Sequence, residues 1–165
     1  MLATLNLQFV ARPPLDLRPD DKDRKDIKAL IDAFFDAGKN KDLTNLSGFH
    51  SSPATFSKFD ENPPYTRQDS EEALVYEQAA FANISDYSYT IEDLRIDLFG
   101  DVAVATFYLG YKGIFINDYS FEGSPVSSRA RVTMVVVRTP QGWKIAHEHF
   151  SKFPDWVGAK SDPRK

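Results

Sequence analysis

The chain has 165 residues, a net charge of −4 and no cysteine, which fits one domain and excludes disulfides, thiolate catalysis and cysteine-ligated zinc. Hydrophobic residues make up 42% of it, no apolar run approaches the roughly 18 residues of a membrane span, and the first ten residues do not read as a secretory signal. We therefore expect a cytoplasmic globular protein with no membrane partner. Because the basic residues are scattered rather than clustered, we also expect no nucleic-acid partner.

The first half of the chain predicts an extended arm followed by helices. Prolines concentrate near the end of residues 1–19, which favours an extended N-terminal arm. Asp20 or Asp21 can cap a helix that ends at Gly38. Its apolar residues recur at helical spacing: Ile27, Leu30, Ile31, Phe34 and Phe35. A second helix is predicted over 69–84, where Asp69 and Glu72 have capping-box spacing.

Between the helices and after them, the pattern changes to that of strands. Residues 54–57 form a candidate short strand, and 87–98 and 101–112 alternate with period two around a tight connection. Residues 131–138 and 143–150 form a second predicted hairpin. The order predicts an α+β domain over 20–153, with helices on one side of a curved sheet of four long antiparallel strands, and a charged tail over 154–165.

The second hairpin suggests where a site could lie. Pro140 and Gly142 predict a three-residue loop that pairs Thr139 with Trp143. In that register one face combines core residues with polar side chains, which predicts a cavity between this face and the long helix. The polar residues of this face are Arg131, His147, His149 and Ser151.

The opposite face of the same hairpin reads as apolar. We expect it to be exposed and to pair with a second copy of the chain, giving a homodimer through the outer face of the sheet. The residues of this patch are Val132, Met134, Val136, Ala146 and Phe150.

Two chemical roles are open for the polar face. His147 and His149 could serve as acid or base, or could simply make structural hydrogen bonds. No metal or other cofactor is predicted, because a metal site would need a third ligand such as His50 or Asp60. Arg131 could anchor an anionic ligand or pair with an internal acid. The predicted ligand-binding set is Arg131, Ser151, Lys58, Phe34, Phe56 and Phe107.

The element order and the final strand, Trp143 to Ser151, resemble a known family. They are similar to the SnoaL-like, ketosteroid-isomerase-like branch of the nuclear transport factor two-like superfamily, over about 20–151. Further matching motifs are Asp36-Ala37-Gly38, Ala54-Thr55-Phe56, Gly100-Asp101-Val102-Ala103-Val104 and Arg131-Val132-Thr133. The resemblance implies a cone-shaped, cystatin-like fold with a pocket between the sheet and the helices.

The resemblance does not carry the isomerase chemistry over. Where the family's Asp base would fall the chain has Lys58, with Asp60 two residues further on, and the expected Tyr and acid positions hold Ile31 and Thr133-Met134. Two functions therefore stay open. One is an isomerase, lyase or hydrolase acting on a small organic substrate, including an anionic one. The other is a non-catalytic ligand-binding or oligomerisation module.

Overall fold

A computed structural model of the chain describes residues 21–117 and 119–153, so the predicted arm, the tail and Asp20 lie outside the described residues. In chain order the elements are α1 (Asp21–Lys39), the 3-10 helix η1 (Leu43–Phe49), β1 (Ser57–Phe59), α2 (Ser70–Ala82), β2 (Ile84–Phe99), β3 (Val102–Ile116), β4 (Gly123–Thr139) and β5 (Gly142–Lys152). None of the described helices is long and apolar enough to cross a membrane.

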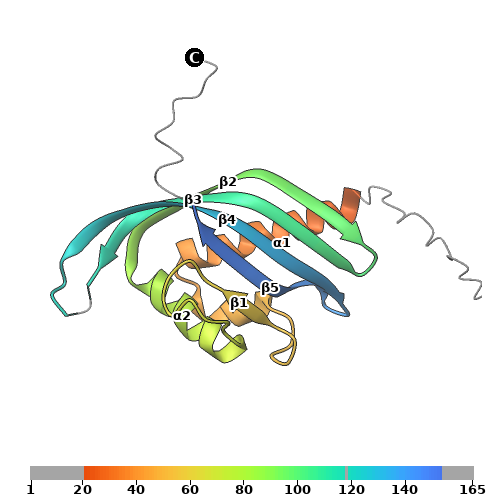
Figure 1. Ribbon diagram of the computed structural model, residues 1–165, viewed down its shortest axis with the longest axis horizontal. Coiled ribbons are helices and arrows are strands. Elements are labelled where there is room, and N and C mark those ends of the chain that lie inside the picture. The colour runs from red at the N-terminus through yellow and green to blue at the C-terminus, as the bar shows by residue number, and fades with distance from the viewer. Residues whose placement is uncertain (1–20, 118, 154–165) are drawn as a thin grey trace, which may run out of the picture.

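The strands form one curved sheet in the order β1-β5-β4-β3-β2, and the helices pack against it (Figure 1). The four long strands are antiparallel, as predicted, and the α+β fold is confirmed. The short strand differs from the prediction, since it spans 57–59 rather than 54–57 and pairs in parallel with β5, with Lys58 opposite Glu148. This parallel pairing places Lys58 beside the middle of β5.

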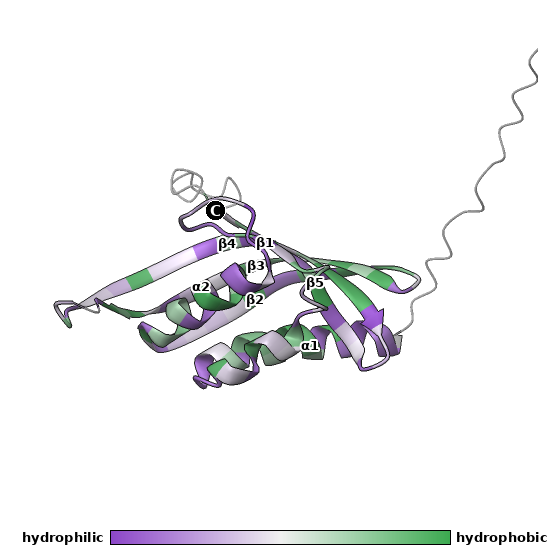
Figure 2. Cartoon of the chain, turned by 90° about the horizontal axis from the view of Figure 1, so that it is seen from below, coloured by the Kyte–Doolittle hydropathy of each residue, from purple (hydrophilic) through white to green (hydrophobic). Residues whose placement is uncertain are grey.

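Helix α1 forms because apolar residues follow its inner face, and it buries that face against the sheet. Ile27, Ile31, Phe34 and Phe35 are at most 2% exposed, and hydropathy alternates along the helix in Figure 2. The Phe35 ring meets Phe107 of β3 edge to face at 6.2 Å. Helix α1 therefore packs against the sheet with its apolar face and forms one side of the hydrophobic core.

Helix α2 begins at the predicted capping box. The Asp69 carboxylate accepts hydrogen bonds from the backbone N–H groups of Glu71 and Glu72, and the Glu72 side chain accepts one from the Asp69 backbone. The buried residues of α2 are Ala73 and Glu77, whereas Tyr76 is 46% exposed. The helix thus turns a carboxyl group toward the interior.

Gly38, near the end of α1, allows close approach of α2. A Cβ atom at this position would overlap the Phe81 ring. Gly38→Ala should therefore lower the free energy of unfolding by about 1–3 kcal/mol in urea denaturation, because overpacking outweighs the gain in helix propensity. Gly48→Ala is the matched control, since a Cβ there meets nothing within 4 Å. Equal effects of the two substitutions would contradict this packing.

The β4–β5 hairpin differs from the predicted register near its turn. Thr139 pairs with Gly142 and Arg138 with Trp143, so the loop has two residues rather than three. A register shift between Val135 and Val136 then leaves Ala146 unpaired, and the predicted pairing of Arg131 with Ser151 holds beyond it. Because of this bulge, Trp143 and Ile145 share the core face with Glu148 and Phe150.

Relative to the prediction, the two faces of β4 and of β5 beyond the bulge are exchanged, whereas Trp143 and Ile145 stay on the core face. Val132, Met134, Val136 and Phe150 are at most 8% exposed within the monomer, so the predicted apolar dimer patch is part of the core. Four of the five predicted interface residues, all but the partly exposed Ala146, are therefore wrong. Pairing of two copies through the outer sheet face stays a prediction, and that face carries the histidines.

Candidate active site

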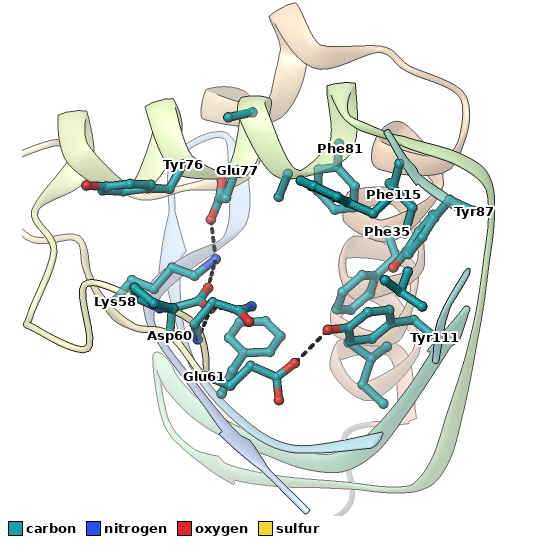
Figure 3. A pocket seen from close by; sticks show the side chains of 18 of the residues that line it. Phe35, Lys58, Asp60, Glu61, Tyr76, Glu77, Phe81, Tyr87, Tyr111 and Phe115 are labelled. Atoms are coloured by element: carbon teal, nitrogen blue, oxygen red, sulfur yellow. Dashed lines mark hydrogen bonds and ion pairs between the residues drawn. The ribbon is translucent and has the colours of Figure 1, made fainter. Parts of the chain in front are cut away.

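A cavity of about 480 Å³ lies between the two helices, the loop after β1 and the concave side of the sheet. This volume falls within the range of small-molecule sites. Its wall has a charged side and an aromatic side, which lie opposite one another in Figure 3. The charged side includes Lys58 and Glu77, and the aromatic side includes Phe81, Tyr87 and Phe115.

Lys58 is the centre of the charged side. Its ammonium donates to Glu77 Oε1 at 2.8 Å and lies 3.1 Å from Glu148 Oε2 and 3.5 Å from Asp60 Oδ2. Lys58, Glu77 and Glu148 are at most 4% exposed. They come from β1, α2 and β5, so the fold brings together three charges that are distant in sequence.

His50 is the fourth member of this buried group. Its Nε2 lies 3.3 Å from Glu148 Oε1 and 3.6 Å from Glu77 Oε2. The imidazole stacks on the Phe56 ring with centroids 4.0 Å apart, and the Ser51 backbone N–H bonds to the Ile145 carbonyl to hold this segment on β5. We call Lys58, Glu77, Glu148 and His50 the buried charge cluster.

The cluster separates the pKa values of its two carboxyl groups. Burial raises the pKa of Glu77 to about 7, with Glu148 adding to the rise and Lys58 opposing it. Burial also opposes ionisation of Glu148, but Lys58 and His50 outweigh it and lower the pKa of Glu148. Although burial favours the neutral amine, Glu77, Glu148 and Asp60 raise the pKa of Lys58. Glu77 is therefore poised to exchange a proton near neutral pH.

Three members of the cluster have the chemistry of metal ligands. His50, Glu77 and Glu148 each offer one ligand atom, and these atoms lie within 4.8 Å of one another. However, the Lys58 ammonium lies 2.8 Å from a Glu77 oxygen and 3.1 Å from a Glu148 oxygen. Because Lys58 already supplies positive charge there, we assign no metal to this group.

The predicted ligand-binding residues divide between the cavity and other places. Lys58 and Phe34 line the cavity. Phe56 is buried against His50, and Phe107 belongs to the hydrophobic core. Arg131 is exposed and pairs with the half-buried Ser151 on the outer sheet face, so neither can anchor a ligand in the cavity.

The predicted catalytic histidines also lie on the outer face of the sheet. His147 Nδ1 lies 2.9 Å from Ser57 Oγ, and His149 is exposed. The Phe59 ring packs against both imidazoles, with centroids 5.9 Å and 5.7 Å away. Burial and the neighbouring His149 lower the pKa of His147. The prediction that this pair faces the cavity is therefore wrong.

The residues that the sequence analysis missed are acids in otherwise apolar patterns. Glu148 interrupts an apolar face of β5, and Glu77 lies four residues from both Ala73 and Phe81 on the inner side of α2. A charged residue at a core position must find a partner or a ligand, so both were detectable signals. Glu61 and Tyr111, on the cavity wall, gave no such signal.

A family model described as a SnoaL-like domain matches residues 27–155. No curated protein matches the sequence at a significant level.

Several solved structures have a similar fold. A proposed dehydratase of the NTF2-like family from Streptomyces avermitilis has 23% identity and a TM-score of 0.70, over 82% of this chain and 99% of that one. A proposed aromatic ring hydroxylase from Novosphingobium aromaticivorans has 20% identity and a TM-score of 0.71, over 83% and 93%. An uncharacterised protein with a cystatin-like fold from Caulobacter vibrioides has 16% identity and a TM-score of 0.66, over 83% and 94%.

Proposed function

This chain belongs to the SnoaL-like domain family and has its cystatin-like fold, as its sequence predicted, and we propose that it is an enzyme that moves a proton on a small organic molecule. The reaction class is isomerase or lyase, with Glu77 as the group that accepts and returns the proton. The observation that carries this proposal is a carboxyl group on the cavity wall whose pKa is raised to about 7. General acid–base catalysis works best when the catalytic pKa is near the working pH.

The remaining members of the buried charge cluster support such a step. Glu77 takes a proton from a substrate carbon, and the electron pair moves into an adjacent carbonyl group or expels a hydroxyl group, which leaves as water when Glu77 returns the proton to it. Lys58 keeps its charge throughout and stabilises the negative charge that develops on the substrate. Loss of water is also the reaction type of the similar Streptomyces avermitilis protein, a proposed dehydratase.

A model proton transfer can test this role without knowledge of the natural substrate. The isoxazole ring of 5-nitrobenzisoxazole opens when a base removes the one C–H proton of that five-membered ring. The electron pair of the C–H bond forms a nitrile, the N–O bond breaks, and a coloured phenolate is released. We expect the protein to accelerate this reaction above an equal concentration of acetate, with the rate rising through a midpoint near pH 7. Glu77→Gln should reduce the rate at least about tenfold.

Glu71→Gln is the matched control for this assay, because it makes the same substitution on an exposed residue of the same helix. We expect it to retain the full rate. Equal rates for wild type and Glu77→Gln would refute the role of Glu77. A rate no higher than that of acetate would favour the alternative, a non-catalytic ligand-binding module.

A further inference from the structure

We propose that the cavity binds a ligand that carries a positively charged amine, with the ammonium group held between Glu61 and the aromatic rings of Tyr111 and Tyr87. This inference rests on the proposed function, because it names the chemical class of molecule that the same cavity takes. It differs from the sequence-based expectation of an anionic ligand, which depended on Arg131.

The first argument is the balance of charge on the cavity wall. Among the described residues that line it, the charged ones are Lys58 and three acids, Asp60, Glu61 and Glu77. The positive charge of Lys58 is already shared by Glu77, Glu148 and Asp60, at 2.8–3.5 Å. An anionic ligand would therefore meet an excess of negative charge, whereas a cation would be attracted.

The second argument is the state of Glu61. Its Oε1 accepts a hydrogen bond from the Tyr111 hydroxyl at 2.9 Å, while its Oε2 is buried and has no hydrogen-bond partner within the described part of the chain. A buried carboxylate oxygen without a partner is costly, and an ammonium group would supply both a hydrogen-bond donor and a compensating charge. Burial raises the pKa of Glu61 and Asp60 adds to the rise, because the Tyr111 hydrogen bond and the charge of Lys152 oppose it only in part.

The third argument is the kind of surface beside Glu61. Figure 3 shows Phe35, Phe81, Tyr87 and Phe115 gathered on the side of the cavity from which Tyr111 reaches toward Glu61. The Tyr87 ring lies 5.5 Å from the Phe81 ring and 6.3 Å from the Tyr111 ring, so the rings form a continuous wall. Aromatic faces attract cations, and the attraction grows when water is excluded.

The side chains of Tyr111 and Tyr87 stay neutral near pH 7. Burial, followed by the charge of Glu61, raises the pKa of Tyr111 to about 12. Burial, followed by Tyr111 and Tyr89, raises the pKa of Tyr87 as well. The rings therefore present neutral π faces near pH 7, and Glu61 supplies the negative charge of the site.

A pair of matched probes, one with an ammonium group and one neutral, tests the inference. 3-(Aminomethyl)phenol and 3-ethylphenol have nearly the same shape, and the first replaces the terminal methyl group with an ammonium group that is charged at pH 7 and donates hydrogen bonds. By isothermal titration calorimetry at pH 7, we expect the ammonium probe to bind at least about tenfold more tightly than its neutral isostere. 3-Hydroxybenzoate, the anionic probe, should bind more weakly than either of them.

Substitutions in the same experiment locate the cation. Glu61→Gln keeps the shape and removes the charge, and it should reduce the preference for the ammonium probe about tenfold. Tyr111→Leu should also reduce it, since the ring is lost. Glu71→Gln, an exposed control on α2, should leave the preference unchanged.

Three results would overturn the inference. They are equal affinities for the charged and neutral probes, a preference for 3-hydroxybenzoate, and a full ammonium preference in the Glu61→Gln variant. Each is separable from failure of the proposed function, because the nitrobenzisoxazole assay uses a neutral probe and reads proton transfer rather than binding. A protein that prefers the ammonium probe but does not open nitrobenzisoxazole would keep this inference and lose the catalytic role of Glu77.

Discussion

Replacing Lys58 by methionine should lower the free energy of unfolding by about 3–5 kcal/mol at pH 7, as is typical when one partner of a buried ion pair is removed. The Lys58 ammonium lies 2.8 Å from Glu77 and 3.1 Å from Glu148, and all three side chains are at most 5% exposed. Methionine fills a similar volume, so the loss would arise from two carboxyl groups left without their cation rather than from a void.

Denaturation in urea can measure this effect against a matched control. Lys112→Met makes the same substitution on an exposed residue of β3, and its effect should stay within about 0.5 kcal/mol. Adding Glu148→Gln to Lys58→Met should restore part of the stability, because it removes one of the uncompensated charges. A loss no larger than that of Lys112→Met would show that the buried charge cluster contributes little to stability.

The helices and long strands could be predicted because their local signals agree with the fold. The capping box at Asp69 and Glu72 forms as expected, and helix α1 ends at Lys39, one residue beyond the predicted Gly38. The period of the apolar residues was therefore sufficient to place the helices and the central parts of the long strands, although β4 begins at Gly123, eight residues before its predicted start at Arg131. The short strand β1 could not be placed, because three residues carry no period and depend on their pairing with β5.

The orientation of the last hairpin could not be predicted, because both of its faces are largely apolar. Pro140 and Gly142 suit more than one turn, and the bulge at Ala146 has no local signature. Tertiary contacts decide the outcome. Trp143 reaches Asp23 of α1 with its indole N–H, at 3.0 Å, while Glu148 reaches Lys58 on the same side of the sheet. Only the bulge lets both face the core.

The residues of the candidate site could also be predicted only in part from the sequence. Lys58 was predicted to bind ligand because the family resemblance pointed to its position, and Lys58 does line the cavity. Its partners Glu77 and Glu148 lie 19 and 90 positions later in the chain, so only the fold brings them together. Residue type alone suggested a role for the histidines, whereas the acids at core positions were the stronger physical signal.

A second large effect is expected in the pH dependence of stability. The folded protein holds the Glu77 proton up to about pH 7, whereas the unfolded chain releases it near the ordinary value of 4.5. Below the lower value both states are protonated, so Glu77 does not influence folding. As the pH rises between the two values only the unfolded state loses the proton, and wild type should lose about 3 kcal/mol relative to Glu77→Gln.

Urea denaturation of both proteins in steps from about pH 4.5 to about pH 8 at constant ionic strength would measure this difference. The groups that face Glu77 are Lys58, Glu148 and His50, and Asp60 contacts Lys58; all four are present in both proteins. The difference between wild type and Glu71→Gln should stay flat over the same range. A flat difference for Glu77→Gln as well would mean that Glu77 is ionised throughout as an ordinary partner of Lys58. The cavity would then lack the near-neutral carboxyl group on which proton transfer depends.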